Sequence, residues 1–166
     1  MSYQEKRTLF TILSGLFILV SYGLYTYGRI QSGLNTFEDL KFWTNSMLMF
    51  IGLGIVITII GQIVFHILIA ISIAIKEKVK DQNTSEAHIE KTIQSEMVCD
   101  EMDKLIEMKS MQISFFFAGM GFVAGLILMA FDYSVVIMLN LLFVSFSLGS
   151  ILEGIAQFVY YRKGLR

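Results

Sequence analysis

The order of apolar and polar positions divides the chain into four long apolar runs and one long polar segment. The runs cover 9–27, 46–75, 113–131 and 134–161, and none contains lysine or arginine. A helix needs roughly 20 mostly apolar residues to cross the hydrocarbon core of a membrane. The pattern therefore predicts an all-α integral membrane four-helix bundle, with a helical cytoplasmic loop over 76–112. The second and fourth runs exceed what a bilayer requires, so we expect those helices to tilt or project beyond it.

Composition agrees with a membrane location and argues against other classes. Hydrophobic residues make up 55% of the 166-residue chain, more than a water-soluble domain of this size can cover. The formal net charge is −1 and no basic patch contains interleaved aromatic residues, so we expect no nucleic-acid partner. The lone cysteine, Cys99, cannot form an internal disulfide. No cofactor motif or metal-ligand spacing stands out, so we expect neither a cofactor nor a metal.

Lysine and arginine positions predict the side of the membrane that each end occupies. They gather before the first run, in the 76–112 segment and after the fourth run, whereas the opposite side carries only Arg29 and Lys41. Because cytoplasmic loops are enriched in these residues, both termini and the central segment are predicted to be cytoplasmic. We therefore expect a multi-pass protein of the cell membrane, in contact with the lipid bilayer.

Small residues recur at helical spacing in the last two runs. They are Gly121 and Gly125 in the third run and Gly149 and Gly154 in the fourth. Such positions let helix backbones approach closely in lipid. They predict packing inside one bundle, and homodimerisation through one of these faces is the alternative.

The polar segment has two apolar faces that one straight helix does not explain. Ile89 and Ile93 share one face, and a second face, rotated well away, comprises Val98, Met102, Leu105 and Ile106. We therefore expect a break near Gln94–Glu96, or two helices that pack on different surfaces. The second part is expected to continue directly into the third span.

Acidic residues accompany these apolar faces, which predicts a docking surface for a cytoplasmic protein partner. The predicted set is Ile89, Ile93, Asp100, Glu101, Met102, Leu105, Ile106 and Glu107. The alternative is a solvated connector whose charges are those of an ordinary helix surface.

Residues 100–109 read Asp-Glu-Met-Asp-Lys-Leu-Ile-Glu-Met-Lys and lead directly into the third apolar run. This stretch resembles the D-E-R-x-K-L-I-E-x-K segment of a group of small four-span membrane proteins of bacteria, with Met102 in place of the arginine. The resemblance implies a bacterial inner membrane and a genomic link to a small regulator. It implies no known activity and supplies no catalytic residue.

Two ionisable residues interrupt the long runs, His66 in the second and Glu153 in the fourth. At about 1.5 Å per residue, both lie roughly 12–14 Å from the cytoplasmic ends of their runs. On neighbouring helices they could pair directly, and Gln62 and Gln157, one turn from each, could extend a polar seam. Polar groups at such depth are costly and are therefore candidate functional groups. The pair is either a structural hydrogen bond that fixes helix register, or it forms a site that titrates protons or the polar end of a cavity.

The sequence contains no recognisable catalytic set, phosphate-binding loop or zinc motif, so we expect the protein not to be an enzyme. The sizeable polar stretch of the chain is the 76–112 segment. The leading prediction is therefore a regulatory or accessory interaction protein that engages a partner through 86–109. The alternative is a small oligomeric transporter or channel with a proton-titratable site at His66 and Glu153.

Overall fold

The computed structural model describes residues 3–80, 85–98 and 100–164. Within these ranges the fold is all-α, as predicted. The helices are α1 (Tyr3–Gln31), α2 (Leu40–Lys80), α3 (Glu86–Met97), α4 (Glu101–Ala130) and α5 (Val135–Lys163). Residues 81–84 and Cys99, which belong to the predicted loop, lie outside the described residues.

Helices α1, α2, α4 and α5 are each long and apolar enough to cross a membrane. Many of their large apolar side chains are uncovered, among them Phe17 at 65% and Phe115 at 70% exposure. Exposure of an apolar surface of this extent to water is energetically costly, whereas its exposure to hydrocarbon lipid is not. The four helices pack as a bundle whose outer surface suits a bilayer.

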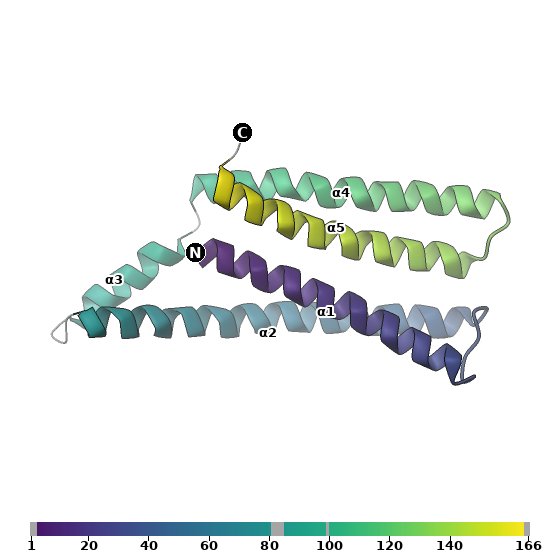
Figure 1. Cartoon of the computed structure of the whole chain (residues 1–166), viewed down its shortest axis with the longest axis horizontal. Helices are drawn as coiled ribbons and strands as arrows, with labels where there is room; N and C mark the ends of the chain where they lie inside the picture. Colours follow the sequence, from purple (N-terminus) through teal and green to yellow (C-terminus); the bar gives the residue numbers. More distant parts are fainter. Residues whose placement is uncertain (1–2, 81–84, 99, 165–166) are drawn as a thin grey trace.

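The longest helix, α2, reaches far beyond the others at one end. Its 41 residues extend about 62 Å at the helical rise, roughly twice the thickness of the hydrocarbon core. Figure 1 shows that α2 runs well past the start of α1, and that α3 folds back from there towards the start of α4. Helices α2 and α3 pack together, and Ile73 and Ile89 are both buried at 7% exposure.

Helix α3 ends at Met97 and α4 begins at Glu101, so the break lies later than the Gln94–Glu96 position that the sequence predicts. Its position is set by a reciprocal cap at the start of α4. The backbone N–H of Asp103 donates to Asp100 Oδ1 at 2.7 Å, and the backbone N–H of Asp100 donates to Asp103 Oδ2 at 3.1 Å. This capping box satisfies two helix-end donors at once, so α4 begins here and continues to Ala130.

The helix order in space differs from the order in sequence. Helix α4 packs along α5, whereas α1 packs against both α5 and α2 (Figure 1). A tight turn joins α4 to α5, with Asp132 at φ 61° and the Ser134 hydroxyl accepting from the backbone N–H of Val136 at 3.3 Å. Helix α1 therefore lies in the middle of the assembly, between the α4–α5 hairpin and α2.

The four glycines singled out by the sequence lie at contacts inside the chain. A Cβ atom at Gly121 would meet Ser145, one at Gly125 would meet Met138, one at Gly149 would meet Ser114, and one at Gly154 would meet Ile12. The first three contacts join α4 to α5, and the last joins α5 to α1. These faces are therefore covered by the chain's own helices.

A buried aromatic cluster holds the other end of the bundle together. It comprises Tyr22, Phe42, Trp43, Met47, Phe50 and Val136, from α1, α2 and α5. The Tyr22 hydroxyl donates to Asn140 Oδ1 at 2.7 Å, which connects α1 to α5 beside the cluster. These contacts join α1, α2 and α5 at this end of the bundle.

Candidate functional site

The N-terminal end of α1 inserts polar side chains among the other helices. Gln4 and Thr8 are buried, at 9% and 5% exposure. Gln4 Nε2 donates to Asp103 Oδ2 at 3.3 Å, and Arg7 Nη1 lies 3.6 Å from Glu107 Oε1. The Arg7–Glu107 pair is partly exposed, so it contributes little to stability, but it joins α1 to α4 and places a cation in this region.

His66 lies at the level of this N-terminal end, not deep inside the bundle as the sequence suggests. Its ring stacks on Tyr3 with centroids 5.4 Å apart, and Tyr3 Oη lies 3.2 Å from His66 Nδ1. Tyr3 is the first residue of α1. The imidazole is therefore near the charged start of α1, because α2 continues well beyond the point where α1 begins.

Glu153 faces a polar cavity of about 240 Å³ between α1, α2, α4 and α5. Gln157 Nε2 donates to Glu153 Oε1 at 3.5 Å, and the Ser114 side chain also interacts with the carboxylate. Gln62 lines the same cavity. Three of the four residues predicted for the polar seam therefore share one site.

The fourth residue, His66, lines an adjoining cavity of about 220 Å³. Gln4, Arg7 and Gln62 line both cavities and lie between His66 and Glu153. Among the described residues, no hydrogen bond joins His66 to Glu153: the imidazole contacts Tyr3 and the carboxylate contacts Gln157. The direct pair considered from the sequence does not form, because α1 occupies the space between them.

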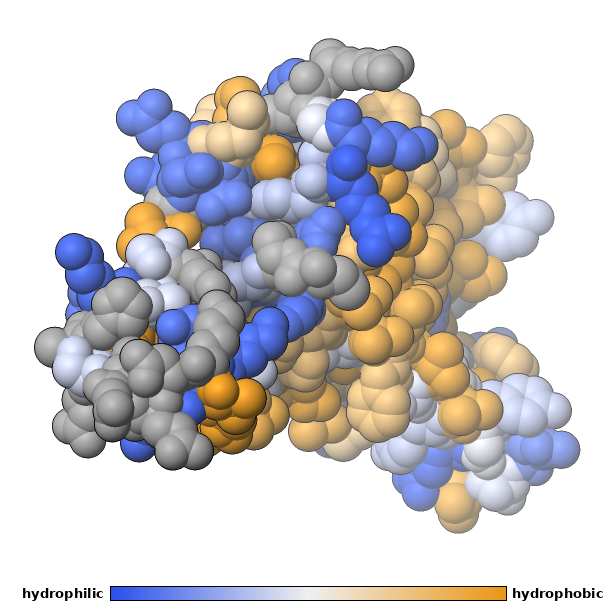
Figure 2. Space-filling model, turned by 60° about the vertical axis from the view of Figure 1, so that its left-hand side comes forward, coloured by the Kyte–Doolittle hydropathy of each residue, from blue (hydrophilic) through white to orange (hydrophobic). Residues whose placement is uncertain are grey.

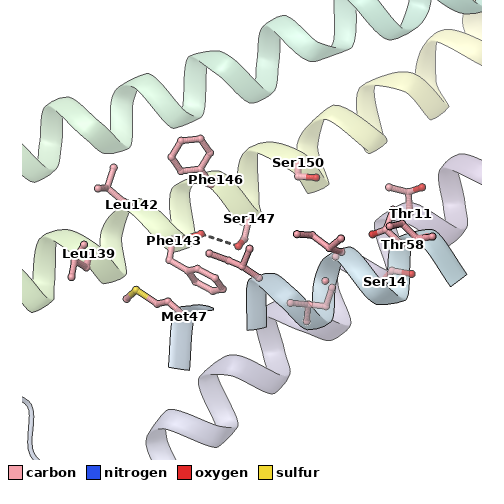
Figure 3. Close-up of a pocket in the computed structure, with 16 residues that line it drawn as sticks. Thr11, Ser14, Met47, Thr58, Leu139, Leu142, Phe143, Phe146, Ser147 and Ser150 are labelled. Atoms are coloured by element: carbon pink, nitrogen blue, oxygen red, sulfur yellow. Dashed lines mark hydrogen bonds between the residues drawn. The ribbon is translucent and has the colours of Figure 1, made fainter. Parts of the chain in front are cut away.

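The Glu153 cavity borders a larger groove of about 710 Å³ between α1, α2 and α5. Thr11 lines both spaces. Figure 3 shows hydroxyl side chains gathered towards one end of the groove and bulky apolar side chains at the other. The hydroxyl residues are Thr11, Ser14, Thr58 and Ser150, with Ser147 between the two groups. A polar strip therefore continues from the cavity into the groove.

Two other polar residues of α5, Asn140 and Ser145, do not join this strip and have other contacts. Asn140 pairs with Tyr22, and Ser145 lies against Gly121 on α4. Ser147 does line the groove, but its hydroxyl donates to the backbone carbonyl of Phe143 at 2.8 Å.

The residues predicted for partner docking separate into covered and uncovered groups. Ile89 and Ile106 are buried, at 7% and 3% exposure, and Ile93 is half-buried. Glu107 is half-buried beside Arg7, and the exposed members are Asp100, Glu101, Met102 and Leu105. Figure 2 turns this end of the molecule towards the viewer and shows hydrophilic side chains gathered there, with hydrophobic side chains on the receding flanks.

Sequence reasoning missed Tyr3, Gln4 and Arg7, which line the cavities beside His66 and Glu153. These residues precede the first apolar run, so a hydropathy boundary places them outside the bundle. A signal was present nonetheless: Gln4, Arg7, Thr11 and Ser14 follow helical spacing and form a polar stripe that continues into the run.

The fold and the polar site define a class of protein, a multi-pass helical membrane protein with a polar cavity at one end. No cluster of three or more potential metal ligands lies in the part of the chain that the structure describes. Comparison of the chain with protein-family models, curated proteins and solved structures gave no match.

Proposed function

We propose that the chain is a cell-membrane interaction protein, regulatory or accessory and not enzymatic, with both termini and α3 in the cytoplasm. The orientation rests on Lys and Arg positions, since Arg29 and Lys41 are the two such residues on the opposite side. The short resemblance around Asp100–Lys109 supports a bacterial inner membrane. The working surface that we propose is the start of α4.

Exposed apolar side chains in a charged segment are the observation that carries this proposal. Met102, Leu105 and Met108 are 54%, 44% and 65% exposed. They alternate with the exposed charges of Glu101, Lys104 and Lys109. Charges at this density keep the segment out of hydrocarbon, so its apolar side chains face water unless a protein covers them.

The chemistry of this surface favours a helical protein partner. Methionine side chains are flexible and polarisable, and they are common on surfaces that accommodate partner helices. Met111 continues the same exposed face towards the membrane at 46% exposure. A partner helix with an apolar stripe and mixed charges at its edges would cover Met102, Leu105 and Met108 and pair with their charged neighbours.

Site-specific photo-crosslinking in cells tests this assignment. A photoreactive residue at Met108 is expected to give one discrete adduct with another protein, and Met102→Gln with Leu105→Gln is expected to abolish it. Leu34→Gln is the matched control, because Leu34 is an equally exposed apolar residue, at 63%, outside this surface. An adduct whose yield is unchanged by the Met102 and Leu105 substitutions would contradict the proposal.

The polar strip supports a second candidate function, a small transporter or channel that moves protons or a small polar solute. The supporting observation is that α1, α2 and α5 all contribute polar side chains to the Glu153 cavity and the adjoining groove. The strip ends at Met47 and Phe143, so passage would require movement of this apolar end or a second copy of the chain.

Proton flux into liposomes that contain a pH-sensitive dye discriminates between the two candidates. The transporter interpretation predicts flux with the wild-type protein and loss of flux in Glu153→Gln. Glu101→Gln is the control, because it removes the same charge from an exposed helix start. Wild-type flux no greater than that of protein-free liposomes would exclude a proton pathway and leave the interaction function standing.

A further inference from the structure

A second polar pocket lies at the opposite end of the molecule, where α1 ends and α2 begins. Its volume is about 350 Å³, and its lining includes Tyr25, Arg29, Asn35, Lys41, Asn45 and Ser46. Ser46 is buried, at 4% exposure. The predicted seam and docking surface lie at the other end, so this pocket has no part in either candidate function.

Two buried polar atoms here lack partners among the described residues. They are Arg29 Nε, a donor, and Asn35 Oδ1, an acceptor. The Asn35 amide is oriented by its own contact, because Nδ2 donates to Asp39 Oδ2 at 2.9 Å and Oδ1 is left over. Burying an unpaired donor and an unpaired acceptor is costly, and a ligand that offers the complementary groups would remove both costs.

The charge balance of the pocket favours an anion. Arg29 and Lys41 contribute two positive charges, and the Arg29 guanidinium lies 6.0 Å from the Phe42 ring centroid. Asp39 contributes the negative charge, but both its oxygens are engaged: Asn35 donates to Oδ2, and the backbone N–H of Phe42 donates to Oδ1 at 3.0 Å. With Arg29 and Lys41 against the single carboxylate of Asp39, the pocket carries a net positive charge.

We propose that this pocket binds the phosphate group of a membrane phospholipid whose headgroup also carries a hydrogen-bond donor. Arg29 and Lys41 would bind the phosphate, as guanidinium and ammonium groups do. A headgroup hydroxyl or ammonium would donate to Asn35 Oδ1. The position favours a lipid over a free anion, because Tyr25 and Tyr27 lie at this end of α1 and are exposed, at 38% and 66%, and exposed tyrosines mark the headgroup level of a bilayer.

Native mass spectrometry of the full-length protein in detergent tests the assignment, with phosphatidylglycerol as the probe. The double variant Arg29→Gln with Lys41→Gln is expected to bind this lipid about tenfold more weakly than wild type. The matched control is Arg162→Gln with Lys163→Gln, which removes two charges at the other end and is expected to leave the affinity unchanged. Arg29→Lys preserves the charge without Nε and is expected to give an intermediate loss.

Two further probes identify the ligand. Diacylglycerol with the same acyl chains lacks phosphate and is expected to bind no better to wild type than to the double variant. Inorganic phosphate is expected to compete weakly. An equal loss of affinity for phosphatidylglycerol in both double variants would overturn the assignment of the binding site to this pocket. Inorganic phosphate that binds as tightly as the lipid would overturn the assignment of the ligand as a phospholipid. A double variant that loses its helical circular dichroism is replaced in the comparison by Arg29→Lys.

Discussion

Replacement of Gly121 by alanine tests the packing of α4 on α5. An ideal Cβ atom at Gly121 would overlap both Oγ and Cβ of Ser145 on α5. Both atoms would lie well inside the 3.4 Å at which ordinary van der Waals contact begins. Because Ser145 Cβ is fixed to its backbone, no change of rotamer removes the clash. The two helices must move apart or rotate.

The expected cost follows from two opposing effects. Forcing extra atoms into a packed contact destabilises by about 1–3 kcal/mol. Alanine in place of a helical glycine gains about 0.5–1 kcal/mol. Gly119 lies two residues away on the same helix, and a Cβ there would meet nothing within 4 Å. Gly119→Ala is therefore expected to show only the stabilisation that alanine gives a helix. The difference in stability between Gly121→Ala and Gly119→Ala then measures the cost of the clash with Ser145.

Unfolding of the purified protein in mixed micelles, titrated with sodium dodecyl sulfate and followed by circular dichroism, measures this difference. Gly121→Ala is expected to unfold at lower dodecyl sulfate than Gly119→Ala. Adding Ser145→Gly to Gly121→Ala removes the obstructing Cβ and is expected to recover most of the loss. Equal stability of the two alanine variants, or no recovery in the double variant, would refute packing of this face inside the chain and would favour a dimer contact instead.

Three further outcomes follow from single contacts. Tyr22→Phe removes the hydrogen bond to Asn140 and is expected to lower the free energy of unfolding by about 1 kcal/mol in the same titration. The control Tyr25→Phe is expected to leave it unchanged. Asp100→Ala removes the cap of α4 and is expected to destabilise its first turn by about 1 kcal/mol, seen as faster amide hydrogen exchange at Asp103 and unchanged exchange in mid-helix. Hydrogen bonds from Asn35 and from the Phe42 backbone lower the pKa of Asp39 below its ordinary 3.8, so its contribution to stability is complete above that pH and is lost as pH falls through the lower, folded-state pKa. Thermal unfolding from pH 7 to pH 3 is expected to show Asp39→Asn less stable than wild type near neutrality, with a difference that shrinks towards the acid end; a pH-independent difference would show that the charge is not involved.

Hydropathy predicted the helical class because membrane spans are specified locally. Runs without lysine or arginine over about 20 residues have few alternatives to a spanning helix. The same criterion stops at the first charge, and it therefore places the first helix at Leu9 although α1 begins at Tyr3. The five residues between them include Gln4 and Arg7, which line the polar cavities.

The arrangement of the candidate site was harder to predict, because it depends on contacts between residues that are distant in the sequence. Hydropathy places His66 by its distance from the end of its own apolar run. In the structure, its surroundings depend instead on where α1 begins beside it. Ile106 belongs by helical spacing to the face that contains Met102, yet it is buried at 3% exposure. Which side of α4 meets the bundle is decided by contacts with α1 and α5, and these are distant in sequence.

The central position of α1 has a consequence for biosynthesis. This helix is made first, yet the helix that covers the polar stripe of Thr8, Thr11 and Ser14 is α5, made last. The two are separated by the 103 residues from 32 to 134, which take roughly 5–20 s to synthesise at ordinary translation rates. Until α5 is made, the stripe can be covered from its own chain only by α2 and by the start of α4, whose Glu107 and Met111 line the same cavity. Productive insertion therefore depends on the insertion machinery retaining α1 until the final hairpin arrives.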